Sequence, residues 1–144
     1  MAFRGIFEHT LDAKGRLTVP ARFRGEFAEG AVLAMSFERC VAIWMPSGYA
    51  AYVAAALRGL NPASPEAQQL SRFFSANSID TELDAAGRVM IPAFLMQHAA
   101  LAKDVVVTGA DTCLELWDRA AWAIYNAELT ARVPNIAARL GHTA

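Results

Sequence analysis

Apolar and polar residues alternate in two short stretches near the start of the chain. The first stretch covers residues 7–11 and the second covers residues 16–19, and residues 12–15 separate them. Alternation with a period of two is typical of a half-buried strand. The separating residues, Asp-Ala-Lys-Gly, favour a turn because Asp can cap its own backbone and Gly tolerates a positive φ. The pattern therefore predicts a hairpin with Leu17 and Val19 facing inward.

The same pattern returns in the second half of the chain. Residues 11–20 read LDAKGRLTVP and residues 83–92 read LDAAGRVMIP, an offset of 72 positions. The segments CVAIW at 40–44 and CLELW at 113–117 correspond at an offset of 73. A self-match of this extent determines the architecture before any local pattern does. The chain is predicted to be a tandem duplication.

Each repeat is predicted to contain a hairpin, a short helix, a second hairpin and a longer helix. Proline and capping residues set the expected helix starts, with Ser64, Pro65 and Glu66 the clearest example. Pro134 is expected to break the last helix. The expected helices are 21–27, 47–57, 65–75, 92–101, 118–129 and a remnant at 136–140. The expected further strands are 32–35, 40–44, 105–108 and 113–117.

These elements predict an α+β fold, mainly a β-barrel core with flanking helices. One repeat alone is too small to bury both faces of its strands, so the two repeats should interlock their hairpins into one pseudo-two-fold barrel. The expected boundaries are 1–60 for the first repeat, 61–75 for a linker and helix, and 76–144 for the second repeat with C-terminal helices. The two repeats are expected to form one pseudo-symmetric domain.

Buried side chains are predicted at several repeated positions. Cys40 and Cys113 are expected to be small core residues in a reducing compartment, and Trp44 and Trp117 are expected to pack in the core. Four further aromatic residues should pack from helices onto neighbouring elements: Tyr49, Tyr52, Trp122 and Tyr125. The N-terminus has no signal-peptide pattern, and the longest apolar stretch is too short to cross a bilayer. These features predict a soluble, cytoplasmic protein.

Basic charge gathers around the first copy of the motif. The formal net charge of the chain is −1, but residues 1–24 carry five basic and two acidic side chains. Lys14 and Arg16 lie on the first turn, and Arg22 and Arg24 follow on the short helix. Arginine suits bidentate contact with guanine or phosphate, and lysine suits phosphate. The pattern is compatible with DNA binding, but also with a solvated charged face and with Asp12–Arg16 and Asp84–Arg88 pairs that only hold the turns together.

Enzyme chemistry has little support in the sequence. The three histidines are scattered without metal-ligand spacing, and the chain lacks CxxC, HExxH, GxxxxGK[ST] and GxSxG motifs. Asp12 and Asp84 could form a carboxylate pair, but each is followed four residues later by an arginine, which lowers a carboxyl pKa rather than splitting a pair. We therefore expect no enzymatic activity, no cofactor, no metal and no small-molecule substrate.

The motif pattern resembles one bacterial family closely. Four features are similar to the MraZ transcription regulators, which belong with the AbrB-like swapped-hairpin folds: Phe3-Arg4-Gly5, the LDxKGRLxVP segment, the repeated DxxGR and the C-terminal Leu116-Trp117 pair. The resemblance covers about residues 3–140. It implies one pseudo-dimeric barrel per chain, assembly into a closed ring, and contact between basic loops and short direct repeats in the family's own promoter.

The resemblance also implies roles for individual residues. Arg4, Lys14, Arg16 and Arg88 match the family's DNA-contacting positions, and Arg22 and Arg24 are added from charge clustering. Asp12, Gly15, Asp84 and Gly87 are the matching structural positions of the two turns. Ala86 replaces Lys14 in the second copy, so we expect the first loop to dominate and the second to face a subunit interface.

The predicted function is a sequence-specific DNA-binding regulator, of the repressor type, associated with the nucleoid. Its expected partners are double-stranded DNA and further copies of itself, without a membrane. A protein-interaction or antitoxin-like module, whose loops meet an acidic partner protein, is the alternative. A cognate partner protein that co-purifies at a fixed stoichiometry would distinguish this alternative from DNA binding.

Overall fold

The computed structural model describes residues 2–141, and each sequence repeat folds into the same order of elements. The first repeat forms β1 (Ile6–Thr10), β2 (Arg16–Thr18), the 3₁₀ helix η1 (Ala21–Phe27), β3 (Ala31–Met35), β4 (Val41–Trp44) and α1 (Pro46–Leu57). The second forms β5 (Ser78–Thr81), β6 (Arg88–Met90), α3 (Ala93–His98), β7 (Asp104–Gly109), β8 (Leu114–Asp118) and α4 (Arg119–Arg139). Helix α2 (Pro65–Ala76) connects the two repeats.

The strands of the two repeats are interleaved. A six-stranded antiparallel sheet has the order β1-β7-β8-β4-β3-β5, and β2 pairs with β6 in a separate two-stranded ribbon. The first strand of each repeat therefore pairs with the third strand of the other: β1 with β7, and β5 with β3. Each repeat therefore completes its sheet with strands of the other, as expected for units too small to bury a core of their own.

An approximate two-fold axis relates the repeats. In the ribbon, Leu17 lies opposite Val89, which is its own counterpart in the second repeat. In the sheet, Ala42 lies opposite Glu115, again a pair of counterparts. The duplication seen in the sequence is thus expressed as an internal two-fold symmetry that passes through both of these pairs.

The main core lies between the ribbon and one face of the six-stranded sheet. Leu17 and Val89 of the ribbon are fully buried together with Leu33, Ile43 and other apolar residues of the sheet. Phe23 and Phe27 of η1 close one side, and Phe3 packs against both, at ring-centroid distances of 5.4 and 5.7 Å. The inward orientation predicted for Leu17 and Val19 is confirmed, since neither has any exposed surface.

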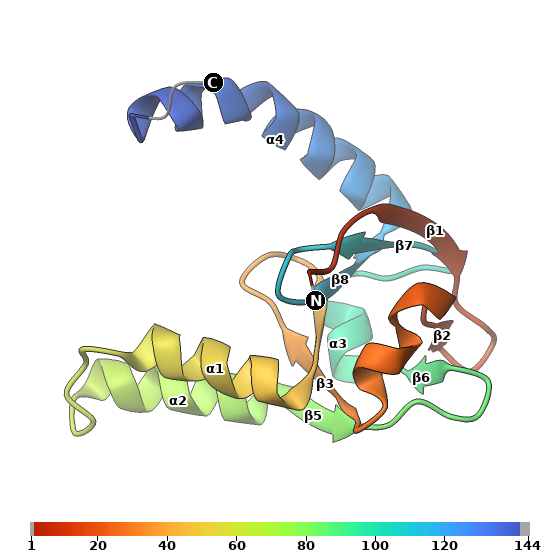
Figure 1. Cartoon of the computed structure of the whole chain (residues 1–144), viewed down its shortest axis with the longest axis horizontal. Helices are drawn as coiled ribbons and strands as arrows, with labels where there is room; N and C mark the ends of the chain where they lie inside the picture. Colours follow the sequence, from red (N-terminus) through yellow and green to blue (C-terminus); the bar gives the residue numbers. More distant parts are fainter. Residues whose placement is uncertain (1, 142–144) are drawn as a thin grey trace.

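In each repeat, three aromatic side chains pack the last helix against the face of the sheet that points away from the main core. Trp44 packs on Tyr49 and Tyr52 of α1 at 5.8 and 4.8 Å. In the second repeat the corresponding triad is Trp117 with Trp122 and Tyr125 of α4, at 5.4 and 4.6 Å. The predicted core positions of both tryptophans are confirmed. Figure 1 shows α1 and α2 side by side, pointing away from the sheet, and α4 leaving it on another side.

The capping prediction at the start of α2 is confirmed. The hydroxyl of Ser64 accepts a hydrogen bond from the N–H of Ala67 at 3.2 Å, and Pro65 occupies the first helical position. Asp118 caps α4 in the same way through the N–H of Ala121 at 3.1 Å. Both caps satisfy backbone donors that the helix itself leaves open.

Three predicted helix boundaries are wrong. Helix α1 begins at Pro46 with Met45 at its N-cap, rather than after the predicted cap Ser47, because proline suits the first helical position. Helix α3 ends at His98 rather than near Leu101. Helix α4 continues through Pro134 to Arg139, so no break precedes a separate remnant. This part of α4 is exposed, so the carbonyl deprived of its donor by Pro134 can reach water, and Figure 1 shows the helix bending along this half.

The predicted α+β class and the interlocking of the repeats are confirmed, but the barrel is not closed. Strands β1 and β5 form the two edges of the six-stranded sheet, and no pairing joins them within residues 2–141. The ribbon covers the core instead of completing a hydrogen-bonded ring. In the described part of the chain, no helix is long and apolar enough to cross a membrane.

Candidate nucleic-acid interface

The β2–β6 ribbon presents four side chains away from the core. Because neighbouring residues of a strand face opposite sides, burial of Leu17 and Val89 directs their neighbours outward. Arg16 lies opposite Met90, and Arg88 lies opposite Thr18. The two arginines of the repeated motif thus share one face of one ribbon, at diagonal corners.

The first loop, residues 12–15 between β1 and β2, is held in shape by hydrogen bonds to Asp12. Its Oδ1 accepts hydrogen bonds from the backbone N–H groups of Lys14 and Arg16, both at 2.9 Å. Its Oδ2 accepts a third from Arg16 Nε at 2.6 Å. Gly15 has a φ of 74°, which an L side chain adopts only with strain. The loop is a fixed turn rather than a mobile tip.

The second loop repeats this geometry. Asp84 accepts hydrogen bonds from the N–H groups of Ala86 and Arg88 at 2.9 Å and from Arg88 Nε at 2.8 Å. Gly87 has a φ of 78°. Hydrogen bonds from the backbone and side chain of the arginine hold the pKa of each aspartate below its ordinary value of 3.8. Both carboxylates are therefore charged at neutral pH.

The aspartates orient the arginines without using all their donors. Each Asp–Arg hydrogen bond engages Nε alone, and within residues 2–141 no hydrogen bond or ion pair engages the Nη groups of Arg16 or Arg88. A guanidinium held at Nε presents its two Nη groups as a fixed pair of donors. Such a pair matches a phosphate or the O6 and N7 acceptors of guanine.

Arg24 connects the first repeat to the second loop. Its Nε donates to the carbonyl oxygen of Val19 at 2.9 Å, and its side chain is half-buried. The guanidinium lies so close to Gly87 that a Cβ at that glycine would stand 2.6 Å from Arg24 Cδ. Arg24 therefore supplies a positive charge beside the second loop, where Ala86 supplies none.

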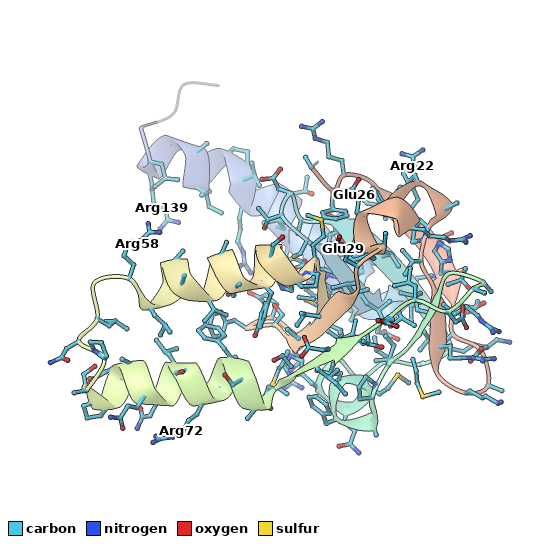
Figure 2. The ribbon with its side chains drawn as sticks, turned by 60° about the horizontal axis from the view of Figure 1, so that its bottom comes forward. Arg22, Glu26, Glu29, Arg58, Arg72 and Arg139 are labelled. Atoms are coloured by element: carbon cyan, nitrogen blue, oxygen red, sulfur yellow. The ribbon has the colours of Figure 1, made fainter. Side chains whose placement is uncertain are left out.

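Arg22 and Arg4 occupy different positions. Arg22 is exposed on η1, and its guanidinium lies 5.3 Å from the centroid of the Phe7 ring. Figure 2 places Arg22 toward one end of η1, with Glu26 farther along the helix and Glu29 just beyond it, so acidic side chains follow the two arginines of this helix. Arg4 is exposed and precedes β1 in the sequence, whereas Lys14 lies after β1. Strand β1 therefore separates Arg4 from the first loop.

Lys103 was missed by the sequence analysis. Its carbonyl oxygen accepts a hydrogen bond from the N–H of Leu11 at 2.8 Å, immediately before the first loop. Lys103 also borders an open hollow of about 710 Å³ that Asp12 and Gly15 line. The pairing of β1 with β7 brings Lys103 to this place, and the repeat alone carries no signal for it, because its counterpart position is Gly30.

Other chemistry-bearing groups lie away from the ribbon. Cys40 and Cys113 are buried and free, and burial raises the pKa of both thiols, that of Cys113 to about 12. Within residues 2–141 no cluster of three or more His, Cys, Asp or Glu could hold a metal ion. Neither thiol is therefore placed to act at the ribbon surface.

The fold and this surface define a duplicated swapped-hairpin protein with a basic ribbon. Comparison with known families finds the same duplication. The family model for the MraZ protein, whose description adds an antitoxin-like character, matches twice, at residues 2–73 and 74–141. The two matches correspond to the two repeats of the sequence.

Curated relatives cover nearly the whole chain. The chain is 35% identical over 136 residues to the transcriptional regulator MraZ of Thermoanaerobacter pseudethanolicus, covering 94% of each chain. It is 43% identical over 126 residues to that of Salinispora tropica, covering 88% of each. It is 35% identical over 137 residues to that of Symbiobacterium thermophilum, covering 95% of this chain and 99% of the relative. The chain belongs to the MraZ family of transcriptional regulators.

Membership of the family confirms two predictions. The resemblance noted in the sequence is confirmed by both family matches. The prediction that the chain is not an enzyme is confirmed, because its relatives are named as transcriptional regulators.

Proposed function

We propose that this regulator binds duplex DNA sequence-specifically through the outward face of the β2–β6 ribbon and its two loops. In this proposal it represses the division and cell-wall gene cluster, including its own promoter, and works in the cytoplasm at the nucleoid. Arg16 and Arg88 make the central contacts. Lys14, Arg24, Arg22 and Arg4 are the further DNA-contacting residues, in order of their support from the geometry.

One observation carries the proposal. Arg16 and Arg88 lie on the same solvent-facing side of one ribbon, each held at Nε by an aspartate. A two-stranded ribbon fits the major groove of B-DNA. Because the guanidinium groups are already oriented, little side-chain entropy is lost when they bind.

The near-neutral charge of the chain requires several chains to act together. Each motif arginine is paired with an aspartate, so one ribbon neutralises few phosphates and binds weakly alone. In a ring, several ribbons held in register reach short direct repeats at a high effective concentration. We therefore propose a ring-like homo-oligomer as the binding form.

Fluorescence anisotropy tests this function. A labelled duplex from upstream of the gene is compared with a scrambled duplex of equal composition over a series of salt concentrations. The proposal predicts tighter binding to the upstream duplex and an affinity that falls steeply with salt. A size measurement on the same samples should show that dissociated chains bind poorly.

Equal and weak binding to both duplexes would overturn the proposal. The loops would then serve the alternative function, contact with an acidic partner protein. Co-purification of one partner at a fixed ratio, lost on removal of Arg16, would establish that alternative.

A further inference from the structure

The internal symmetry of the ribbon has consequences for the way it meets DNA. Leu17 and Val89 pair at its centre, and the N–H groups of Val19 and Ile91 donate to Gly87 and Gly15 at 2.9 and 3.0 Å at its two ends. A two-fold ribbon with identical halves would fit a duplex equally well in two opposite orientations. Any preference between the two must come from residues that break the symmetry.

Two residues at the end of the ribbon next to the first loop break its two-fold symmetry. Lys14 corresponds to Ala86, and Thr18 corresponds to Met90. Since Met90 lies opposite Arg16, it stands beside the loop that carries Lys14, and Lys103 borders that loop as well. The other end has Ala86 and Thr18 beside Arg88, with Arg24 held across Gly87.

Met90 is an unusual residue for this surface. It is 55% exposed, although the other three outward residues of the ribbon, Arg16, Thr18 and Arg88, are charged or polar. The 5-methyl group of thymine is the apolar feature that a base pair presents in the major groove. A threonine at the corresponding place combines a small methyl group with a hydroxyl, so the two ends favour different base edges.

We propose that the ribbon binds an asymmetric DNA site in one orientation, and that Met90 sets it by contacting a thymine methyl group beside the base pair read by Arg16. The proposal rests on the DNA-binding function proposed above. Lys14 strengthens the same orientation through a phosphate contact at that end. Each chain thereby reads a direction along the duplex despite its internal two-fold symmetry.

Deoxyuridine provides a matched change in the DNA, because it removes only the 5-methyl group of thymine. Each thymine of the bound upstream duplex is replaced in turn, and affinity is measured for the wild type and for Met90→Ala. One replacement should weaken the wild type about fourfold, as expected for loss of one buried methyl contact. The same replacement should not affect Met90→Ala.

An exchange variant tests orientation directly. Thr18→Met combined with Met90→Thr keeps the composition of the ribbon but moves the methionine to the end that carries Arg88. Because the methionine sets the orientation, the ribbon should turn round on the duplex and the same thymine should stay sensitive. The phosphate contact of Lys14, located by methylphosphonate replacement of single phosphates, should then move to the other side of the site centre. Circular dichroism and thermal melting establish that the variants are folded. If the exchange variant is unfolded, Met90→Thr alone is used, and it should lose the sensitivity to the thymine replacement.

Three outcomes distinguish failure of this inference from failure of the proposed function. Specific binding with no thymine whose effect depends on residue 90 would overturn the inference and leave the proposed function standing. Specific binding in which the exchange leaves the phosphate contact of Lys14 on its original side would also overturn it. Equal binding of upstream and scrambled duplexes would overturn the proposed function and this inference together.

Discussion

Arg24 of the first repeat closes over Gly87 of the second loop. A Cβ at Gly87 would lie 2.6 Å from Arg24 Cδ and 2.9 Å from Arg24 Cζ. At Gly15, the counterpart, the nearest atom to a Cβ is the Ile91 carbonyl oxygen at 3.9 Å. The two glycines have nearly the same backbone angle, but only Gly87 is also restricted by a neighbouring side chain.

Gly87→Ala should therefore destabilise the protein more than Gly15→Ala. Each substitution places a side chain at positive φ, which costs about 1–2 kcal/mol. Gly87→Ala must in addition displace the guanidinium that is bonded to the Val19 carbonyl oxygen. Urea unfolding of the two variants measures the difference in the free energy of unfolding.

A double-mutant cycle isolates the contribution of Arg24. In an Arg24→Ala background, Gly87→Ala should cost about as much as Gly15→Ala, because the obstructing side chain is gone. An equal cost for Gly87→Ala in both backgrounds would show that Arg24 does not restrict this position.

The carboxylate of Asp12 should be needed for the shape of the first loop. Asp12→Ala removes three hydrogen bonds to Lys14 and Arg16, whereas Asp12→Asn keeps the Oδ1 acceptor. DNA affinity should fall most for Asp12→Ala and less for Asp12→Asn, even though both substitutions remove a negative charge next to the proposed interface. Anisotropy titrations test this order. If either variant bound more tightly than the wild type, charge rather than loop geometry would control affinity.

Acid should weaken the loops through Asp12 and Asp84. Their pKa is lowered in the folded chain, first by the backbone hydrogen bonds of Arg16 and Arg88, from an ordinary value of 3.8. A lowered carboxyl pKa contributes stability that is present above the ordinary value and is lost as the pH falls below it through the folded value. Burial raises the pKa of Glu115, which acts in the opposite direction, so wild type must be compared with a variant.

The matched variant is Asp12→Asn with Asp84→Asn. Urea unfolding between pH 5 and pH 2.5 should show a smaller loss of stability for this variant than for the wild type. Parallel curves would mean that the two carboxylates have the same pKa in the folded and unfolded chains.

The two thiols should be inert in the folded chain. Burial raises the pKa of Cys113 from 9.0 to about 12, and that of Cys40 is also raised. A shift of this size lowers the thiolate fraction about a thousandfold near pH 8, and burial limits access as well. Labelling with iodoacetamide, followed by mass spectrometry, should modify both cysteines in urea and neither without it. Rapid labelling of the native chain would contradict the described core.

Much of the fold follows from the duplicated motif. The repeat places Leu17 and Val89 at equal positions in two short strands, and strands this short cannot be buried without a partner, so pairing between repeats could be expected. The Asp-x-x-Gly-Arg spacing likewise indicates both turns, since an Asp can accept hydrogen bonds from the backbone two and four residues ahead.

Other features depend on contacts that no local pattern encodes. Lys103 reaches the first loop only because β7 pairs with β1, and Arg24 meets Gly87 only because β2 pairs with β6. Pro134 indicates a helix break, but the helix continues because its exposed side leaves the affected carbonyl open to water. Open edges at β1 and β5 replace the predicted closed barrel because the ribbon, not a continuous ladder, covers the core.

The most direct measurement compares two arginine substitutions that change the net charge equally. Arg16 lies on the ribbon, whereas Arg58 is exposed at the end of α1 (Figure 2), away from the loops. Arg16→Ala and Arg58→Ala are titrated against the upstream duplex at one salt concentration, after size measurement shows the same assembly for both. We predict at least a tenfold loss for Arg16→Ala, about 1.4 kcal/mol, and nearly unchanged affinity for Arg58→Ala. Equal losses for the two variants would mean that overall charge, and not the ribbon, binds DNA.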